Sequence, residues 1–203
     1  MEDSYITLQK PAEGIYRDKG SRFLSFGFPV TSEPEVREIL AGLRKKYHDA
    51  RHHCFAYRLG PRNEQYRMND DGEPSGTAGR PIYGQLVSAN ITNVLVVVVR
   101  YFGGTLLGTG GLIQAYRSAT SDMLSHATLI SQAVLVKYRI TFPYEALNAV
   151  MRILKEESLT PADPVYGTVC SMIIPVREGL AEKLAGRLTI IPGLVRDSLP
   201  TDD

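Results

Sequence analysis

A glycine-rich segment, residues 103–111 (GGTLLGTGG), is the first candidate for chemistry. Glycines let successive backbone N–H groups point at one place, and a helix beginning after them adds the positive end of its dipole, so the segment can bind phosphate or carboxylate. It lacks the lysine of a P-loop and the G-x-G-x-x-G of dinucleotide sites. The alternative is a tight strand-to-helix connection that needs positive φ angles. The candidate anion-binding residues are Gly103, Gly104, Thr105, Gly108, Gly110 and Gly111.

A second loop, residues 70–79 (DDGEPSGTAG), carries three carboxylates within four residues. Such oxygen ligands suit a hard cation such as Mg²⁺, although the spacing of an EF-hand is absent. The alternative is a turn-rich loop whose acids pair with nearby arginines. Ser75 would be a nucleophile only with a base such as His52 or His53 beside it. The loop-site candidates are Asp70, Asp71, Glu73, Ser75 and Thr77, and the three acids among them are the magnesium candidates.

Basic side chains concentrate just before this loop, since residues 44–67 contain seven Lys or Arg and two acids. The net charge of +1 excludes a polybasic nucleic-acid binder, but a local basic patch could still bind phosphate. The alternative is a solvated face with local charge pairs. The candidate nucleic-acid or anion contacts are Arg22, Arg51, His52, Arg58, Arg62, Arg67 and Arg100. Zinc is disfavoured at His48, His52, His53 and Cys54, because paired cysteine spacing is missing.

The two loops flank an apolar run, residues 94–100 (VLVVVVR), which predicts a central strand buried on both faces. Helices are predicted after each loop, over residues 81–89 and 112–127. Residues 52–59 alternate and predict a strand with Cys54 and Phe55 on opposite faces. Further strands at residues 5–9, 14–16, 22–30 and 64–69, with a helix at about 33–47, complete a predicted domain over residues 1–130.

The pattern changes after residues 129–132, which predicts a second domain over residues 133–203. Helices at residues 144–157 and 178–188 alternate with strands at 134–142, 160–166, 168–176 and 194–199. This βαββαβ order is the ferredoxin-like arrangement, an antiparallel sheet covered by helices on one face. The fold class is therefore α+β. Because this half has no glycine-rich loop and no cluster of His, Cys or paired acids, we expect docking or regulation from it.

The apolar content indicates a protein of the cytoplasm without a membrane partner. No apolar run approaches the roughly 18 residues that span a bilayer. The N-terminus, MEDSYITLQKP, has no apolar signal region. Cys54 and Cys170 are expected to be reduced thiols. No cofactor is expected, apart from Mg²⁺ at the acidic loop.

Two long motifs, RMNDDGEPSGTAGRP and NVLVVVVRYFGGTLLGTGGLIQAY, resemble the IMPACT/YigZ family, as do KGSRF and ARHHCFAYRLG upstream. The resemblance covers nearly the whole chain, in the bacterial two-domain form. It implies an N-terminal domain similar to ribosomal protein S5 domain 2 and a ferredoxin-like C-terminal domain similar to the last domain of elongation factor G. Val99 and Leu106 depart from the family pattern, and the second removes an expected cation from the glycine loop.

The resemblance implies a link to translation. Eukaryotic relatives block activation of the amino-acid-starvation kinase through its coactivator, with an extra RWD domain that this sequence does not show. No enzyme activity is implied. The leading hypothesis is a non-enzymatic regulator whose first domain binds RNA, the ribosome or a translation factor. The alternatives are an enzyme or binding protein for a phosphorylated small molecule or nucleotide, and a pure protein-docking module.

Overall fold

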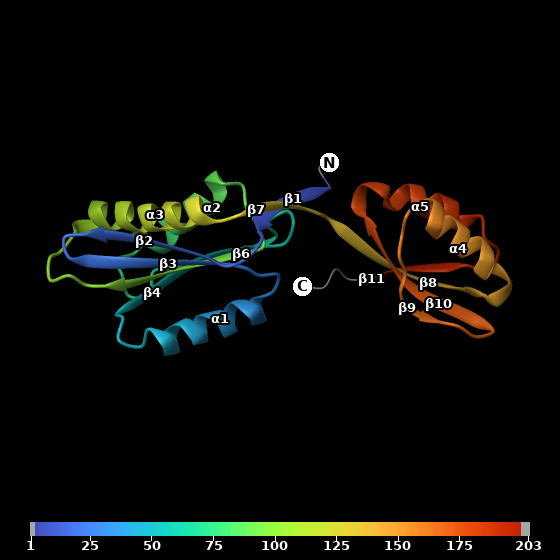
Figure 1. Cartoon of the computed structure of the whole chain (residues 1–203), viewed down its shortest axis with the longest axis horizontal. Coiled ribbons are helices and arrows are strands. Elements are labelled where there is room, and N and C mark those ends of the chain that lie inside the picture. Colours follow the sequence, from blue (N-terminus) through green and yellow to red (C-terminus); the bar gives the residue numbers. More distant parts are fainter. Residues whose placement is uncertain (1–2, 200–203) are drawn as a thin grey trace. The chain divides into compact units, whose positions relative to one another are not determined.

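The computed structural model describes residues 3–199, which form two compact units (Figure 1). The first unit comprises Tyr5–Gln132, and the second comprises the chain from Ala133 onward together with residues 3 and 4. Each unit has its own apolar core. No helix among residues 3–199 is long and apolar enough to cross a bilayer.

The first unit is built on an antiparallel five-stranded sheet of order β2-β3-β6-β4-β5. A separate two-stranded sheet pairs β1 with β7. The strands are β1 (Ser4–Leu8), β2 (Ala12–Asp18), β3 (Ser21–Pro29), β4 (His52–Leu59), β5 (Gln65–Asn69), β6 (Val94–Tyr101) and β7 (Leu129–Ala133). The helices are α1 (Glu33–Lys46), α2 (Gly79–Ser88) and α3 (Gly108–His126).

Helices cover both faces of this sheet, with α1 on one face and α2 and α3 on the other (Figure 1). The valines of β6 divide accordingly, since Val96 and Val98 pack toward α2 and α3 while Val97 and Val99 pack toward α1. All four are fully buried. The prediction that residues 94–100 form a central strand buried on both faces is therefore confirmed.

The second unit is an antiparallel four-stranded sheet of order β11-β8-β10-β9. Alternate residues of β10, such as Met172 and Ile174, are buried in one core with α4 and α5. Both helices thus cover the same face, and the predicted βαββαβ order is confirmed (Figure 1). The elements are β8 (Leu135–Pro143), η1 (Tyr144–Ala146), α4 (Leu147–Glu156), β9 (Ala162–Val165), β10 (Val169–Arg177), η2 (Glu178–Leu180), α5 (Ala181–Thr189) and β11 (Val195–Leu199).

Both helices that follow the candidate loops begin earlier than predicted. α3 starts at Gly108 instead of residue 112, so Gly110 and Gly111 belong to its first turn. Burial of Leu112, Tyr116 and the small residues between and beyond them holds this helix in place despite its weak glycine start. α2 starts at Gly79 instead of residue 81, because a distant carboxylate caps it, as described below. Strand β7, where only a domain boundary was expected, forms by pairing with β1.

Candidate functional site

Strand register brings the candidate residues together at one end of the five-stranded sheet. Arg22 of β3 lies opposite Tyr101 of β6, and Arg100 lies opposite His52 of β4. The glycine-rich segment leaves β6 at this end. The acidic loop folds back onto the same end, because it follows β5 and contacts the start of β4.

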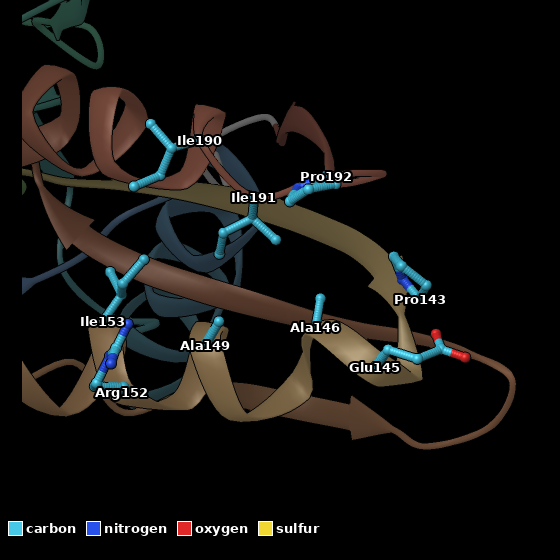
Figure 2. A pocket seen from close by; sticks show the side chains of 9 residues that line it. All are labelled: Pro143, Glu145, Ala146, Ala149, Arg152, Ile153, Ile190, Ile191 and Pro192. Atoms are coloured by element: carbon cyan, nitrogen blue, oxygen red, sulfur yellow. The ribbon is translucent and has the colours of Figure 1, made fainter.

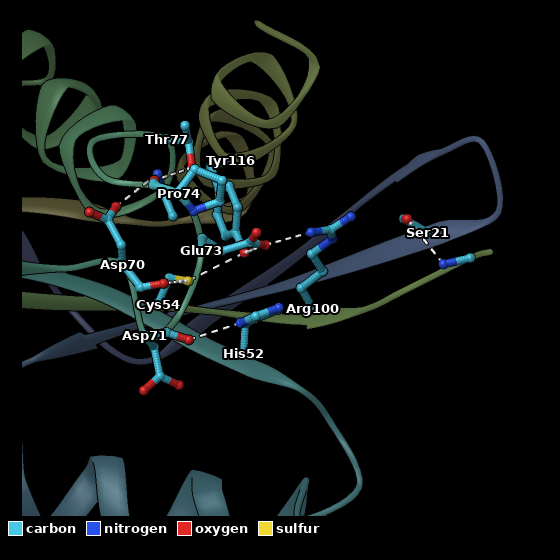
Figure 3. Close-up of polar contacts among 12 residues, drawn as sticks. Ser21, His52, Cys54, Asp70, Asp71, Glu73, Pro74, Thr77, Arg100 and Tyr116 are labelled. Atoms are coloured by element: carbon cyan, nitrogen blue, oxygen red, sulfur yellow. Dashed lines mark hydrogen bonds and ion pairs between the residues drawn. The ribbon is translucent and has the colours of Figure 1, made fainter. Parts of the chain in front are cut away.

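The acidic loop is bonded to three consecutive residues of β4, of which Figure 3 shows His52 and Cys54. Nδ1 of His52 lies 2.8 Å from the carbonyl oxygen of Asp71, so this ring nitrogen carries the proton. The backbone N–H of His53 donates to Oδ2 of Asp71 at 2.7 Å. The Cys54 thiol donates to the carbonyl oxygen of Asp70 at 2.9 Å. The loop is therefore a fixed part of the sheet surface.

A buried ion pair closes the loop against the sheet. Oε1 of Glu73 accepts hydrogen bonds from Nη1 of Arg100 at 2.6 Å and from the Tyr116 hydroxyl at 2.7 Å. The side chains of Glu73 and Arg100 are only 3% and 6% exposed. Desolvated charges are tolerated when they are paired and hydrogen-bonded, as here. The guanidinium also lies over the rings of Phe23 and Phe102, at 5.4 and 5.7 Å from their centres.

Arg100 was expected to contact phosphate, and its position corrects that expectation. Its charge is already neutralised by Glu73 inside the protein. We assign it the structural role of holding the acidic loop and supporting Phe102. Its Nε is buried without a hydrogen-bond partner among the described residues.

Cys54 and Tyr116 complete this cluster in neutral form. Burial raises the pKa of the Cys54 thiol far above its ordinary value, which the hydrogen bond to Tyr116 only partly opposes. Burial also raises the pKa of the Tyr116 hydroxyl, which the neighbouring Cys54 and Glu73 reinforce. A neutral thiol is a poor nucleophile, so Cys54 is a packing and hydrogen-bonding residue here.

The three acids of the loop face three different partners (Figure 3). Asp70 accepts the backbone N–H groups of Gly76, Ala78 and Gly79 at 2.8, 3.0 and 2.8 Å. It thereby caps α2, where a negative charge is favoured by the helix dipole. Asp71 pairs with Arg44 at 3.1 Å, and Glu73 pairs with Arg100. Their carboxylates do not converge on one point, and no group of three or more His, Cys, Asp or Glu in residues 3–199 could hold a metal ion.

The hydroxyl candidates of the loop are not arranged around a base. Thr77 is buried and donates to the carbonyl oxygen of Pro74 at 2.6 Å. Ser75 is exposed and has no hydrogen bond to a histidine among the described residues. The geometry thus offers no activated nucleophile at Ser75.

Close packing and backbone conformation explain most of the glycines in the glycine-rich segment, residues 103–111. A Cβ on Gly103 would overlap the backbone of Gly20 and Ser21 in the turn between β2 and β3. The N–H of Gly103 also donates to Oγ of Ser21 at 3.1 Å. Gly104 and Gly108 have φ angles of +87° and +71°. The tight-connection alternative therefore accounts for these three glycines, while Gly104, Thr105 and Leu106 remain exposed to solvent.

The basic segment does not form one patch, which corrects a second expectation. Arg58 is buried and donates to the carbonyl oxygens of Leu86 and Ile91 at 3.1 and 2.9 Å, so it is unavailable to phosphate. Arg62 and Arg67 belong to the β4–β5 hairpin at the opposite end of the sheet from Arg22. Arg22 and Arg51 remain exposed at the end that holds the two loops.

Comparison with known proteins decides the family. A family model described as the Impact N-terminal domain matches residues 19–124. IMPACT family member YvyE of Bacillus subtilis (strain 168) is 35% identical over 156 residues, which cover 77% of this chain and 72% of the relative. The chain belongs to the IMPACT family. IMPACT family member YigZ of Escherichia coli (strain K12) is 32% identical over 154 residues, which cover 75% of this chain and 76% of the relative.

A solved crystal structure of a hypothetical protein extends the likeness to both units. It covers 100% of this chain and of its own, with a TM-score of 0.76 and 27% sequence identity. Within the first unit, the IMPACT match begins at Lys19, in the turn that packs on Gly103, and it ends in α3 beyond Tyr116. The family resemblance therefore spans the whole loop-and-sheet assembly described above.

Two members of the assembly were absent from the sequence-based candidates. Tyr116 lies on the buried face of α3, where an aromatic residue is normally core, so its sequence position carries no signal. Ser21 was noticed only as part of a turn and a family motif, yet its hydroxyl holds Gly103. The family motifs that contain Ser21 and Tyr116, KGSRF and GGLIQAY, were the available signal.

Proposed function

We propose that this protein is a cytoplasmic, translation-linked regulator whose first unit binds structured RNA, on the ribosome or beside a translation factor. We assign that unit to the S5 domain 2-like fold and the second to the ferredoxin-like fold of the elongation factor G C-terminus. The proposed contact surface is the rim, which we define as Arg22, Arg51, Phe102, Gly104 and Thr105. Membership of the IMPACT family supports the link to translation.

The observation that carries the proposal is the exposed aromatic ring of Phe102 at the end of the sheet that also holds two exposed cations. Phe102 is 44% exposed, and the buried Arg100 guanidinium lies 5.7 Å from the centre of its ring. A fixed, solvent-facing ring is the platform on which unpaired RNA bases stack. Arg22 and Arg51 lie at the same end of the sheet and supply charge for phosphates.

The test is a salt series with structured RNA and with ribosomes. We expect binding to weaken steeply as salt rises, because each phosphate contact releases counterions. The double variant Arg22→Ala/Arg51→Ala should lower the magnitude of the salt slope by about 1–2. Phe102→Ala should weaken binding to unpaired RNA by about tenfold without changing that slope.

The matched control removes the same charge from the other end of the sheet. Arg62→Ala/Arg67→Ala changes the net charge equally, but these residues lie on the β4–β5 hairpin. It should leave the salt slope unchanged. Equal loss of binding in both double variants, or no binding at low salt, would overturn the proposal.

A second candidate function is binding of a phosphorylated small molecule or nucleotide at the glycine-rich loop. The observation that favours it is the exposure of Gly104 and Thr105 on the loop that leaves β6. A metabolite and nucleotide screen by thermal shift, with and without Mg²⁺, tests it. If no ligand raises the midpoint of unfolding, this candidate is wrong.

A further inference from the structure

The second unit contains a cavity of about 460 Å³ on its helical side (Figure 2). One wall is α4 with the turn before it, including Ala146, Ala149 and Ile153. The other wall is the turn after α5, including Ile190 and Ile191. Its volume falls in the range of protein sites that hold a ligand or an anchoring side chain. We call this cavity the α4 groove.

Ion pairs join α4 and α5 at the end of α4, and the groove extends from there toward the start of α4. Arg187 of α5 pairs with Glu156 and Glu157 at the end of α4, and Lys183 pairs with Glu157 at 3.0 Å. Toward the start of α4, the inward residues are the small Ala146 and Ala149, followed two turns from Ala146 by Ile153. Small side chains at this helical spacing leave the space unfilled.

Opposite charges mark the two ends of the groove. Glu145 lies at one end and Arg152 at the other, as Figure 2 shows. They are seven residues apart, which is roughly 10 Å along a helix axis. Neither side chain has a hydrogen bond or an ion pair with another described residue. An occupant would therefore need an apolar centre, an anionic group near Arg152 and a cationic group near Glu145.

The exposed edge of the groove favours a peptide over a small molecule as the occupant. Ile190 is 78% exposed at the edge, and a molecule held inside the cavity would leave much of it in water. A helix lying along the groove would cover Ile190 while placing its apolar residues between the walls. Charges two turns apart on such a helix would match the separation of Glu145 and Arg152.

We propose that the α4 groove binds a short amphipathic helix of a partner protein, lying antiparallel to α4. In this orientation the partner helix begins near Arg152 and carries an acidic residue in its first turn. It carries a basic residue two turns later, near Glu145. This order suits the dipole of the partner helix, which favours acids at its start and bases toward its end. Apolar residues at helical spacing between the two charges fill the cavity.

The test uses the full chain and two synthetic helical peptides of identical composition. The acid-first peptide carries Glu at one position, Leu at three and four residues beyond it, and Lys at seven residues beyond it. The control peptide has Glu and Lys exchanged. Fluorescence anisotropy should show that the acid-first peptide binds about tenfold more tightly, a difference of about 1.4 kcal/mol.

Substitutions in the protein locate the site. Ala149→Leu should fill the groove and abolish binding of both peptides. Glu145→Lys/Arg152→Glu should reverse the preference so that the control peptide binds more tightly. The matched controls on α4 are Met151→Leu and Lys155→Glu, because neither residue lines the groove. Both should bind as the parent does, and circular dichroism should show all variants folded.

Four outcomes would overturn the proposal. The first three are equal affinity for the two peptides, unchanged binding in Ala149→Leu, and no binding at peptide concentrations of about 1 mM. If the free protein sediments as a dimer that Ala149→Leu dissociates, a second copy occupies the groove and the proposal is wrong. Because the rim belongs to the other unit, RNA binding by Ala149→Leu should be unchanged, so the two proposals fail independently.

Discussion

The acidic loop of the first unit and the α4 groove of the second are opposites in how they use charge. In the loop, every carboxylate has a partner within the first unit: Asp70 has backbone N–H groups, Glu73 has the buried Arg100, and Asp71 has Arg44 at the surface. In the groove, Glu145 and Arg152 lie at the two ends of an apolar hollow, without a hydrogen-bond or ion-pair partner among the described residues. The comparison shows that the segment richest in motifs can be devoted to folding, while a segment without motifs leaves surface open for binding.

The largest effect should follow from breaking the buried pair in the loop. Glu73→Ala leaves the Arg100 charge buried and unpaired, which should cost about 3–5 kcal/mol. Urea unfolding followed by circular dichroism measures this loss. The control is Glu156→Ala, whose carboxylate is 51% exposed and pairs with Arg187, so it should cost less than about 1 kcal/mol. Equal costs for the two variants would remove the contrast between a buried structural pair and a surface pair.

Removal of the α2 cap should have the next largest effect. Asp70→Ala leaves the N–H groups of Gly76, Ala78 and Gly79 without their acceptor, which should cost about 2 kcal/mol. Hydrogen exchange at these amides should speed up, while exchange in the second unit should not change. Asp70→Asn keeps one acceptor oxygen, so its free energy of unfolding should lie between those of the parent and Asp70→Ala. Unchanged exchange at Gly79 in Asp70→Ala would contradict the capping role.

A pair of glycine substitutions tests which part of the glycine-rich segment, residues 103–111, is needed for the fold. Gly103→Ala should destabilise by about 1–3 kcal/mol, since its Cβ meets the backbone of Gly20 and Ser21. Gly110→Ala meets no atom within 4 Å and lies in α3, so it should stabilise by about 0.5–1 kcal/mol. Thermal unfolding compares the two. Effects of the same sign would indicate that the contact with Gly20 is not what requires Gly103.

The smallest effect concerns the ion pairs that join α4 and α5 beside the α4 groove. Hydrogen bonds from Arg187 and Lys183 lower the pKa of Glu157 below its ordinary value of 4.5. A lowered pKa means that this carboxylate stabilises the fold above pH 4.5 and that the contribution is lost as the pH falls through the folded value. The stability difference between the parent and Glu157→Gln should therefore be present at pH 7 and shrink as the pH falls below 4.5 through the folded pKa of Glu157. A difference that is independent of pH would contradict the stabilising role of these ion pairs.

The strands of the first unit could be predicted from local patterns because successive residues of a strand are buried in two different cores, one on each face of the sheet. The alternation of residues 52–59 correctly separates Cys54 from Phe55, since the two lie in different cores. The same pattern cannot indicate which residues each side chain contacts in the folded protein. In the sequence, Arg58 of the basic segment and Arg100 at the end of the apolar run look like free cations, but register and helix placement bury both.

The candidate site was predictable in its membership more than in its roles. The two glycine-containing loops do lie at one end of the sheet, but the start of α2 depends on Asp70, which precedes it by nine residues. The Tyr116 hydroxyl donates a hydrogen bond to Glu73 only once α3 packs on the sheet. The α4 groove depends on where two alanines point, and their types alone do not indicate a hollow.

The place of β6 in the sheet has a consequence for synthesis of the chain. β6 lies between β3 and β4, although both of these strands are made before it. While the chain is being translated, the facing edges of β3 and β4 have no strand to pair with until residue 101 has left the ribosome. The contact between Gly103 and Gly20 then joins the newest segment to the oldest hairpin. The nascent first unit therefore exposes two unpaired strand edges, which can pair with other chains, until β6 has been made.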